Sequence, residues 1–269
     1  MRAIAVNFPE SDFPHSQLID QTAEACGIAK EAAAIAAESI ATRSQILLNT
    51  LCEYEKQLVR LEMEIGAGVA AALTQVGDRE VQEVLACMKF ATGLKQIGGF
   101  LLCTATSAQT ADFVDPQDTR DLIRMAAVLE KMLTHLSGAF SSRDLEKAAA
   151  ALKSGAEMDR VQSLFAMRHF SHSENVPERR SQQVVSMANC LKEAGDQAQT
   201  LSEGICHFVS GNRALQDLVA RSKPVERAFL SWLQHREATS YRSELGSARR
   251  RTIRIQLRPP FRTSRGIAR

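Results

Sequence analysis

An all-α fold is predicted by three features of the sequence. Alanine is abundant in segments such as AKEAAAIAAESIA and LEKAAAALKS, aromatic residues make up 5% of the 269 positions, and there are only 14 glycines and 7 prolines. Alanine has the highest intrinsic helix propensity, so this composition favours helices over strands. With 45% hydrophobic and 24% charged residues, the chain is expected to form a soluble globular core.

Six long helices are expected, at about residues 16–42, 43–72, 77–108, 116–140, 141–170 and 177–210. In the third and fourth of these, apolar residues recur with helical spacing and predict one buried stripe each. The stripe of the third comprises Val81, Val84, Leu85, Met88 and Ala91. That of the fourth comprises Leu122, Ala126, Leu129, Leu133 and Leu136.

Helix ends are indicated by local signals. Asp115 followed by Pro116 is typical of a helix start, because the carboxylate caps free amides and proline fits the first turn. Ser141 with Asp144 three residues later resembles a capping box and predicts the start of the fifth helix. The sixth helix is expected to end at the sequence SGN, where Gly211 suits a C-terminal cap.

An internal repeat divides the six helices into two sets of three. ATGLKQIGG (91–99) matches ANCLKEAGD (188–196) at an offset of 97, and Arg43 and Arg60 match Arg143 and Arg160 at an offset of 100. Because each amphipathic helix must bury its stripe against neighbours, two tandem antiparallel three-helix bundles are predicted. The expected segments are an N-terminal piece at 1–15, bundles at 16–110 and 116–212, and a C-terminal extension at 213–269.

The C-terminal extension carries most of the charge asymmetry. Residues 236–269 contain ten arginines and two glutamates and no lysine or aspartate, in a chain whose net charge is only +2. This region is rich in arginine and lacks amphipathic periodicity, so a flexible tail is expected. The alternatives are a docking arm for an acidic partner, or a contact to nucleic acid or lipid phosphates. The candidate basic residues are Arg249, Arg250, Arg251, Arg254 and Arg258.

The repeated motif and the helix order resemble the PhoU family, whose third helices carry a pattern like Leu-Glu-Arg-Ile-Gly-Asp. LKEAGDQAQTLSEGICHFVSG (191–211) is similar to the second copy of this pattern, and LKQIGGFLLCTAT (94–106) to the first; SSRDLEKAAAALKSGAEMD (141–159) resembles the start of the family's fifth helix. The matching positions are Leu191, Gly195, Asp196, Glu203 and Gly211 in the second copy, and Leu94, Ile97 and Gly98 in the first. The resemblance covers about residues 16–212 and implies two homologous three-helix bundles.

The family's metal-ion clusters, which the resemblance implies, depend on pairs of acidic residues four positions apart. Here Lys192 replaces the first acid of the second pair, and Lys95 and Gly99 replace both acids of the first. An ammonium repels a cation, so no metal cluster and no cofactor are expected, and Lys192 is predicted to pair with Asp196 in a solvated polar stripe that also includes Glu203. The alternative is that Asp196 and Glu203 remain as metal ligands.

Gly98 and Gly195 are predicted to remain glycine for a different reason, which is close packing of their helices on a neighbour. A helix backbone can approach another helix most closely where it has no Cβ atom. This requirement does not depend on bound metal.

The resemblance implies a non-enzymatic cytoplasmic regulator of phosphate uptake and phosphate-responsive signalling. It would act by contact with the ATPase of a phosphate ABC transporter and with a sensor histidine kinase, and family members commonly self-associate, as in a homodimer. The alternative is a helical adaptor that uses its arginine-rich tail to bind nucleic acid or an anionic membrane, without any link to phosphate. Base stacking is not indicated, because only Phe261 follows Arg258 in the tail.

Other site types find little support in the sequence. There is no P-loop, no Gly-x-Ser-x-Gly elbow, no Gly-x-Gly-x-x-Gly after a strand and no Glu-x-x-His pair, so we predict that the chain is not an enzyme. No stretch of about 18 uncharged apolar residues occurs, so no membrane span is expected. His169 and His172 are expected in an exposed turn, the alternative being a shared metal ion.

The cysteines are scattered without a Cys-x-x-Cys pair, and each falls in a predicted helix. They are Cys26, Cys52, Cys87, Cys103, Cys190 and Cys206. We expect them to be small buried apolar residues in a reducing cytoplasm, the alternative being a catalytic or redox cysteine.

Overall fold

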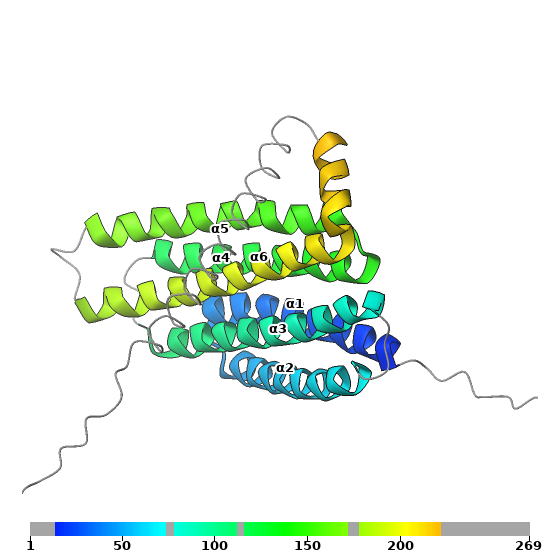
Figure 1. Cartoon of the computed structure of the whole chain (residues 1–269). Coiled ribbons are helices and arrows are strands. Elements are labelled where there is room, and N and C mark those ends of the chain that lie inside the picture. The colour runs from blue at the N-terminus through cyan, green and yellow to red at the C-terminus, as the bar shows by residue number, and fades with distance from the viewer. Residues whose placement is uncertain (1–13, 74–77, 112–115, 172–177, 222–269) are drawn as a thin grey trace, which may run out of the picture. The chain divides into compact units, whose positions relative to one another are not determined.

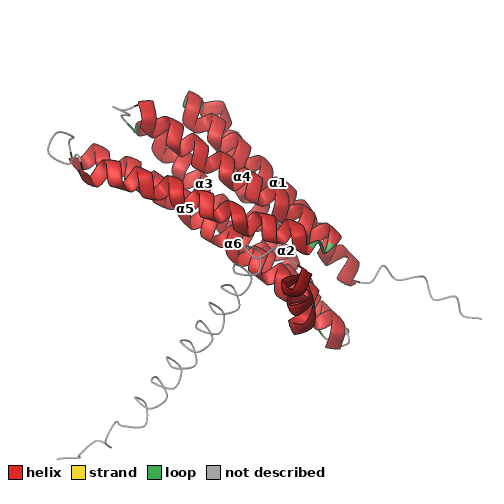
Figure 2. Cartoon of the chain, turned by 90° about the horizontal axis from the view of Figure 1, so that it is seen from above, coloured by secondary structure: helices red, strands yellow, loops and turns green. Residues whose placement is uncertain are grey.

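The fold is all-α, as predicted from the composition. The computed structural model describes residues 14–73, 78–111, 116–171 and 178–221, and contains no strand in those ranges. Its helices are α1 (Pro14–Thr42), α2 (Gln45–Ala72), α3 (Asp78–Thr110), α4 (Pro116–Ser142), α5 (Leu145–Ser171) and α6 (Glu178–Arg221). Figures 1 and 2 show these long helices. The chain divides into one compact unit that ends at Gly211 and another that begins at Asn212.

Most helix starts lie within two residues of those predicted, but two end signals were wrong. α4 begins at Pro116, as expected, whereas Asp115 lies outside the described residues. The cap of α5 is Asp144 and not Ser141, because an Asp144 Oδ1 accepts bonds from the backbone amides of Glu146 at 2.9 Å and Lys147 at 3.2 Å. Helix α6 continues through Gly211 to Arg221, so that glycine is no helix end.

The internal repeat appears directly in the backbone. Arg43 and Arg143 have φ angles of 53° and 52°, the left-handed conformation that often follows a helix C-terminus. They directly follow equivalent helices, α1 and α4, at the offset of 100 already visible in the sequence. After Arg143, the amide of Asp144 donates to the carbonyl of Ala139 at 3.0 Å, which closes the helix end.

The helix core is built from leucine, isoleucine, methionine and many alanines. The stripe predicted for α4 is confirmed, since all five of its residues are buried. The stripe predicted for α3 is confirmed only in part, because Leu85 is 50% exposed while Val84 and Ala91 are buried. Helix α1 packs on α2, α3 and α4, α2 packs on α3, and α4 packs on α5. No helix in the described ranges has the length and hydrophobicity needed to cross a membrane.

Glycines allow helices to pack closely on one another, as predicted for Gly98 and Gly195. A Cβ atom on Gly98 of α3 would lie 2.7 Å from Leu58 Cδ1 of α2. A Cβ atom on Gly195 of α6 would lie 3.2 Å from Met158 Cγ of α5. The third helix of each set therefore packs tightly on the second at the repeated glycine, which brings their polar side chains together one turn away.

Candidate functional site

The repeated polar site of this chain is built around two lysines, Lys192 on α6 and Lys95 on α3. Lys192 Nζ lies 3.1 Å from Asp159 Oδ1 of α5 and also contacts Asp196 Oδ1 one turn along α6. The predicted ion pair between Lys192 and Asp196 is therefore confirmed. Its second partner, Asp159, was missed, and it converts a local pair into a bridge between two helices.

The first bundle contains a corresponding bridge. Lys95 Nζ of α3 lies 3.2 Å from Glu62 Oε2 of α2, whose other carboxylate oxygen accepts a bond from Thr92 Oγ1 at 3.4 Å. The Glu62 side chain is 17% exposed and the Lys95 side chain 40% exposed. This bridge lies one turn before Gly98, where α3 packs closely on α2.

The two bridges obey the sequence repeat. Lys95 and Lys192 are 97 positions apart, and so are their partners Glu62 and Asp159. Sequence reasoning found the lysines but missed the acids, because the acids lie 33 residues upstream on another helix. The signal available in the sequence was an acidic residue 33 positions before each lysine, in the middle helix of each set.

The electrostatics of Lys192 favour a permanent ammonium. Burial by itself lowers the pKa of Lys192, but the bonds to Asp196 and Asp159 outweigh it and raise the pKa above its ordinary value. The positive charge is thus present at neutral pH and lies against two carboxylates. A divalent cation would need these same oxygens, and it would be repelled by the ammonium.

The residues present therefore do not fit the metal clusters that the fold family implies. Asp196 remains beside Lys192, and Glu203 lies two turns further along α6, partly buried. Gly99, which corresponds to Asp196 in the repeat, has no side chain that could bind a metal, and no atom of a neighbouring helix lies within 4 Å of where its Cβ would be. Within the described ranges no group of three or more His, Cys, Asp or Glu side chains could hold a metal ion.

The prediction that Lys192, Asp196 and Glu203 form a solvated polar stripe was wrong in part. Lys192 has a side chain that is only 24% exposed, and Glu203 is of intermediate exposure. Only Asp196, with a side chain 44% exposed, lies near solvent as predicted. The stripe is therefore a half-buried seam in which charged groups bond across helices.

A second charged cluster joins the start of α4 to the end of α5. The buried Asp118 binds Arg168 Nη2 at 3.2 Å and His169 Nε2 at 3.0 Å, and Arg168 also binds Asp121 Oδ2 at 2.6 Å. The prediction of an exposed turn was wrong for His169, whose side chain is only 12% exposed and stacks 4.5 Å from the ring of Phe165. The cluster holds two helix ends together. His172 lies outside the described residues.

The cysteines do not share one environment, so the expectation of six buried thiols was wrong. Cys26, Cys87 and Cys206 are buried, Cys52 and Cys190 are partly exposed, and Cys103 is exposed. The two thiols of Cys103 and Cys190 lie 3.6 Å apart across α3 and α6.

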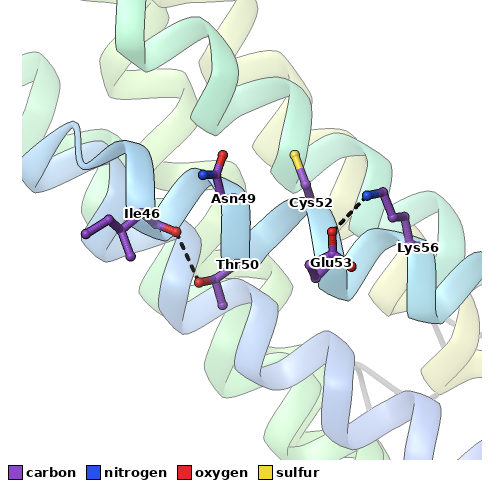
Figure 3. A pocket seen from close by; sticks show the side chains of 6 residues that line it. All are labelled: Ile46, Asn49, Thr50, Cys52, Glu53 and Lys56. Atoms are coloured by element: carbon purple, nitrogen blue, oxygen red, sulfur yellow. Dashed lines mark hydrogen bonds and ion pairs between the residues drawn. The ribbon is translucent and has the colours of Figure 1, made fainter.

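A shallow depression follows one face of α2 near its start. Figure 3 shows its lining, in which Glu53 and Lys56 point toward one another and bond at 2.8 Å. The other lining residues are Ile46, Asn49, Thr50 and Cys52. Ile46 is 78% exposed, so the depression presents an apolar edge beside a neutralised charge pair.

The basic tail residues of the sequence prediction, Arg249, Arg250, Arg251, Arg254 and Arg258, lie outside the described residues.

Comparison with known proteins agrees with the repeated helix architecture. Residues 122–205 match the family model described as PhoU domain. The structure is similar to the crystal structure of PhoU from Pseudomonas aeruginosa, with a TM-score of 0.68 and 16% sequence identity over 74% of this chain and 98% of that chain. It is also similar to the phosphate transport system regulatory protein PhoU from Streptococcus pneumoniae, with a TM-score of 0.67 and 14% identity over 73% of this chain and 95% of that chain.

No curated protein matches the sequence. The domain match lies within α4 to α6, and the structural likeness extends over nearly the whole of the two crystallised chains. The chain therefore contains a PhoU domain at residues 122–205, and its described helices have the fold of the two PhoU crystal structures.

Proposed function

We propose that this chain is a non-enzymatic regulator of phosphate uptake and of phosphate-responsive signalling. It acts by contact with the ATPase of a phosphate ABC transporter and with a sensor histidine kinase. The observation that carries the proposal is the PhoU domain at residues 122–205, together with its structural repeat in the first half of the chain. The structurally similar protein from Streptococcus pneumoniae is a phosphate transport system regulatory protein, which supports the same role.

In this proposal the work is done by helix surfaces and not by a bound metal. Two lysine bridges occupy the repeated positions, Lys95 with Glu62 and Lys192 with Asp159. In each bridge, the lysine ammonium neutralises the carboxylate of the neighbouring helix. The bridges connect the second and third helices of each set and so fix the surface that the set offers to a partner. The chain is proposed to regulate without metal clusters.

The apolar face of α5 is a surface suited to such contact. Leu164 and Met167, three residues apart on this helix, are 56% and 64% exposed. Exposed apolar side chains at helical spacing can dock in a groove on another protein. Ser163 is exposed on the same helix and offers a matched polar position.

The proposal is tested by binding of the full chain to the purified transporter ATPase and to the cytoplasmic part of the sensor kinase from the same source. Lysates from phosphate-fed and phosphate-starved cells provide the second arm, with the full chain as bait. Recovery of either named partner, in an amount that changes with phosphate, is the expected result. Failure to bind both purified partners, with no recovery under either condition, would overturn the proposal.

A matched pair of variants then tests the surface. Leu164→Glu should weaken partner binding at least tenfold, which corresponds to about 1.4 kcal/mol. Ser163→Glu introduces the same charge on the same helix and should leave partner binding nearly unchanged. Both variants should keep the wild-type melting temperature, because both positions are exposed.

The same binding assay addresses the tail-based alternative. A full-length variant with glutamine at the five arginines Arg249, Arg250, Arg251, Arg254 and Arg258 removes the charge without removing the chain. Binding that persists in this variant assigns the contact to the helices. Binding that is lost, and that is steeply salt-sensitive in the wild type, would favour the adaptor function.

A further inference from the structure

Cys103 and Cys190 form a pair of thiols at the seam between the two sets of helices. Their sulfur atoms are 3.6 Å apart, the Cys190 thiol donating a hydrogen bond to Cys103. Cys103 is exposed and Cys190 is partly exposed, in contrast to the buried Cys26, Cys87 and Cys206. The two residues are 87 positions apart in the sequence, so only the fold brings them together.

The seam itself is an antiparallel pairing of α3 with α6. A Cβ on Gly93, near the middle of α3, would lie 2.8 Å from Leu201 Cδ2 of α6, whereas Cys103, further along α3, contacts Cys190, which comes before Leu201 in α6. Figure 1 shows the two helices running side by side in opposite directions. The thiol pair thus joins a helix of the first set to its counterpart in the second, at a position held by close packing.

We propose that Cys103 and Cys190 are a redox modification site, in which a peroxide or a small-molecule disulfide oxidises the two thiols to a reversible disulfide that locks α3 to α6. The required closure is from 3.6 Å to the roughly 2 Å of an S–S bond, which side-chain rotation and a small helix shift supply. The site does not depend on the proposed function, because it rests on sulfur positions alone.

The two thiols have different roles in the oxidation. Cys103 is the exposed one and meets the oxidant first. Burial, and then its contact with Cys103, raises the pKa of Cys190 to about 11, so Cys190 stays protonated and acts second. A solvent-accessible thiol next to a second, resolving cysteine is an arrangement that redox-sensing pairs use.

Hydrogen peroxide oxidises the pair in two steps. The Cys103 thiolate attacks one peroxide oxygen; an S–O bond forms, the O–O bond breaks, and hydroxide leaves and takes the proton that Cys103 had released, as water. The Cys190 sulfur then attacks the Cys103 sulfenic acid; the S–S bond forms, the S–O bond breaks, and the hydroxyl leaves as water with the Cys190 proton. The two sulfurs lose two electrons in total, and the peroxide gains them. A thiol reductant reverses the reaction.

The disulfide would restrict motion between the two sets of helices. In the reduced chain, α3 and α6 are held at this point by packing and by the weak thiol hydrogen bond, whereas a covalent bond would prevent their separation. The oxidised chain should therefore melt at a higher temperature, and amides along the α3–α6 seam should exchange hydrogen more slowly.

The test uses the full-length reduced chain treated with hydrogen peroxide. Thiol titration under denaturing conditions should fall from six to four groups. Peptide mass spectrometry should show one linkage, between the peptides of Cys103 and Cys190, with the chain lighter by two hydrogen atoms. Dithiothreitol should restore six thiols. Oxidised glutathione should give the same linkage, which shows that the pair accepts oxidants of both classes.

Variants separate this outcome from incidental oxidation. Cys103→Ser and Cys190→Ser should each abolish the linkage and the gain in melting temperature, whereas Cys52→Ser, at another partly exposed cysteine, should keep both. Serine is close in size to cysteine, and the circular dichroism of each reduced variant verifies that it folds. A linkage through any other pair, or oxidation that ends in sulfinic acid at Cys103 without a disulfide, would overturn the proposal.

Discussion

The ammonium of Lys192 lies 3.1 Å from a carboxylate oxygen of Asp159, so an ion pair connects α6 to α5 in the second set of helices. The same ammonium also bonds to Asp196 on its own helix. One positive charge therefore lies between two negative ones that would repel each other without it. The half-buried position of Lys192 limits the screening that weakens exposed pairs.

This arrangement predicts that replacing the lysine by an acid creates a metal site. Lys192→Glu would place three carboxylates together, the oxygen ligands that Mn²⁺ prefers. Without metal, we expect this variant to lose about 1–2 kcal/mol of unfolding free energy, from two lost ion pairs and new repulsion. Millimolar Mn²⁺ should restore the loss, as measured by melting temperature with and without a chelator.

The control for this experiment is Lys192→Met, which removes the charge without adding a ligand. It should be destabilised by a smaller amount and should not respond to Mn²⁺. The wild-type chain should also show no shift in melting temperature with Mn²⁺. A wild-type shift as large as that of Lys192→Glu would contradict our account of the lysine bridge.

Two adjacent glycines of α3 should respond in opposite directions to alanine. Gly99→Ala should stabilise the protein by about 0.5–1 kcal/mol, because the site is open and alanine favours the helix. Gly98→Ala should destabilise it by about 1 kcal/mol, because the new methyl would lie 2.7 Å from Leu58 Cδ1 in the core and the packing cost exceeds the gain in propensity. Chemical denaturation monitored by circular dichroism measures both, and equal effects would contradict the packing argument.

The contrast between these glycines shows what the sequence can predict and what it cannot. Helix number, fold class and the close approach at Gly98 follow from composition, periodicity and the repeat, which are local or regularly spaced signals. Asp159 could not be assigned to Lys192, because the pairing depends on how α5 and α6 rotate about their axes. For the same reason, the contact of His169 with Asp118 was missed, since it joins residues 51 positions apart.

The cluster around Asp118 should contribute strongly to stability. Asp118→Asn keeps the shape of the side chain but removes the negative charge that Arg168 and His169 bind. The amide NH2 of the new side chain is a hydrogen-bond donor and would face the N–H donors of these two residues. We expect a loss of about 1–3 kcal/mol in unfolding free energy, the range for a buried group that loses charged partners. Urea denaturation at neutral pH gives the measurement.

Asp20→Asn is the matched control for this substitution. Asp20 lies on α1 with an exposed side chain, so the same chemical change should alter stability by no more than about 0.5 kcal/mol. If Asp118→Asn were as mild as Asp20→Asn, the bonds at the α4–α5 junction would contribute nothing net to folding.

Alkaline pH should destabilise the protein through its buried thiols. Burial, and then the nearby Cys87, raises the pKa of Cys26 from its ordinary 9.0 to about 12. Below pH 9 the thiol is neutral in both states, so its stabilising contribution is complete. As pH rises from 9 toward 12, the unfolded chain ionises Cys26 while the folded chain does not, and up to about 4 kcal/mol of this contribution is lost.

Cys26→Ala has no thiol to ionise at this position, so it should lose less stability than wild type as pH rises above 9. Cys190→Ala should flatten the pH dependence by a smaller amount, because the pKa of Cys190 is raised only to about 11. The measurement is urea denaturation with reductant at pH 8, 9, 10 and 11. Lys192 also contributes at the upper end of this range. Because its pKa is raised, its ammonium and its ion pairs are lost only above about pH 10.5. Parallel pH profiles for wild type and Cys26→Ala would mean that the buried thiol is not the source of alkaline instability.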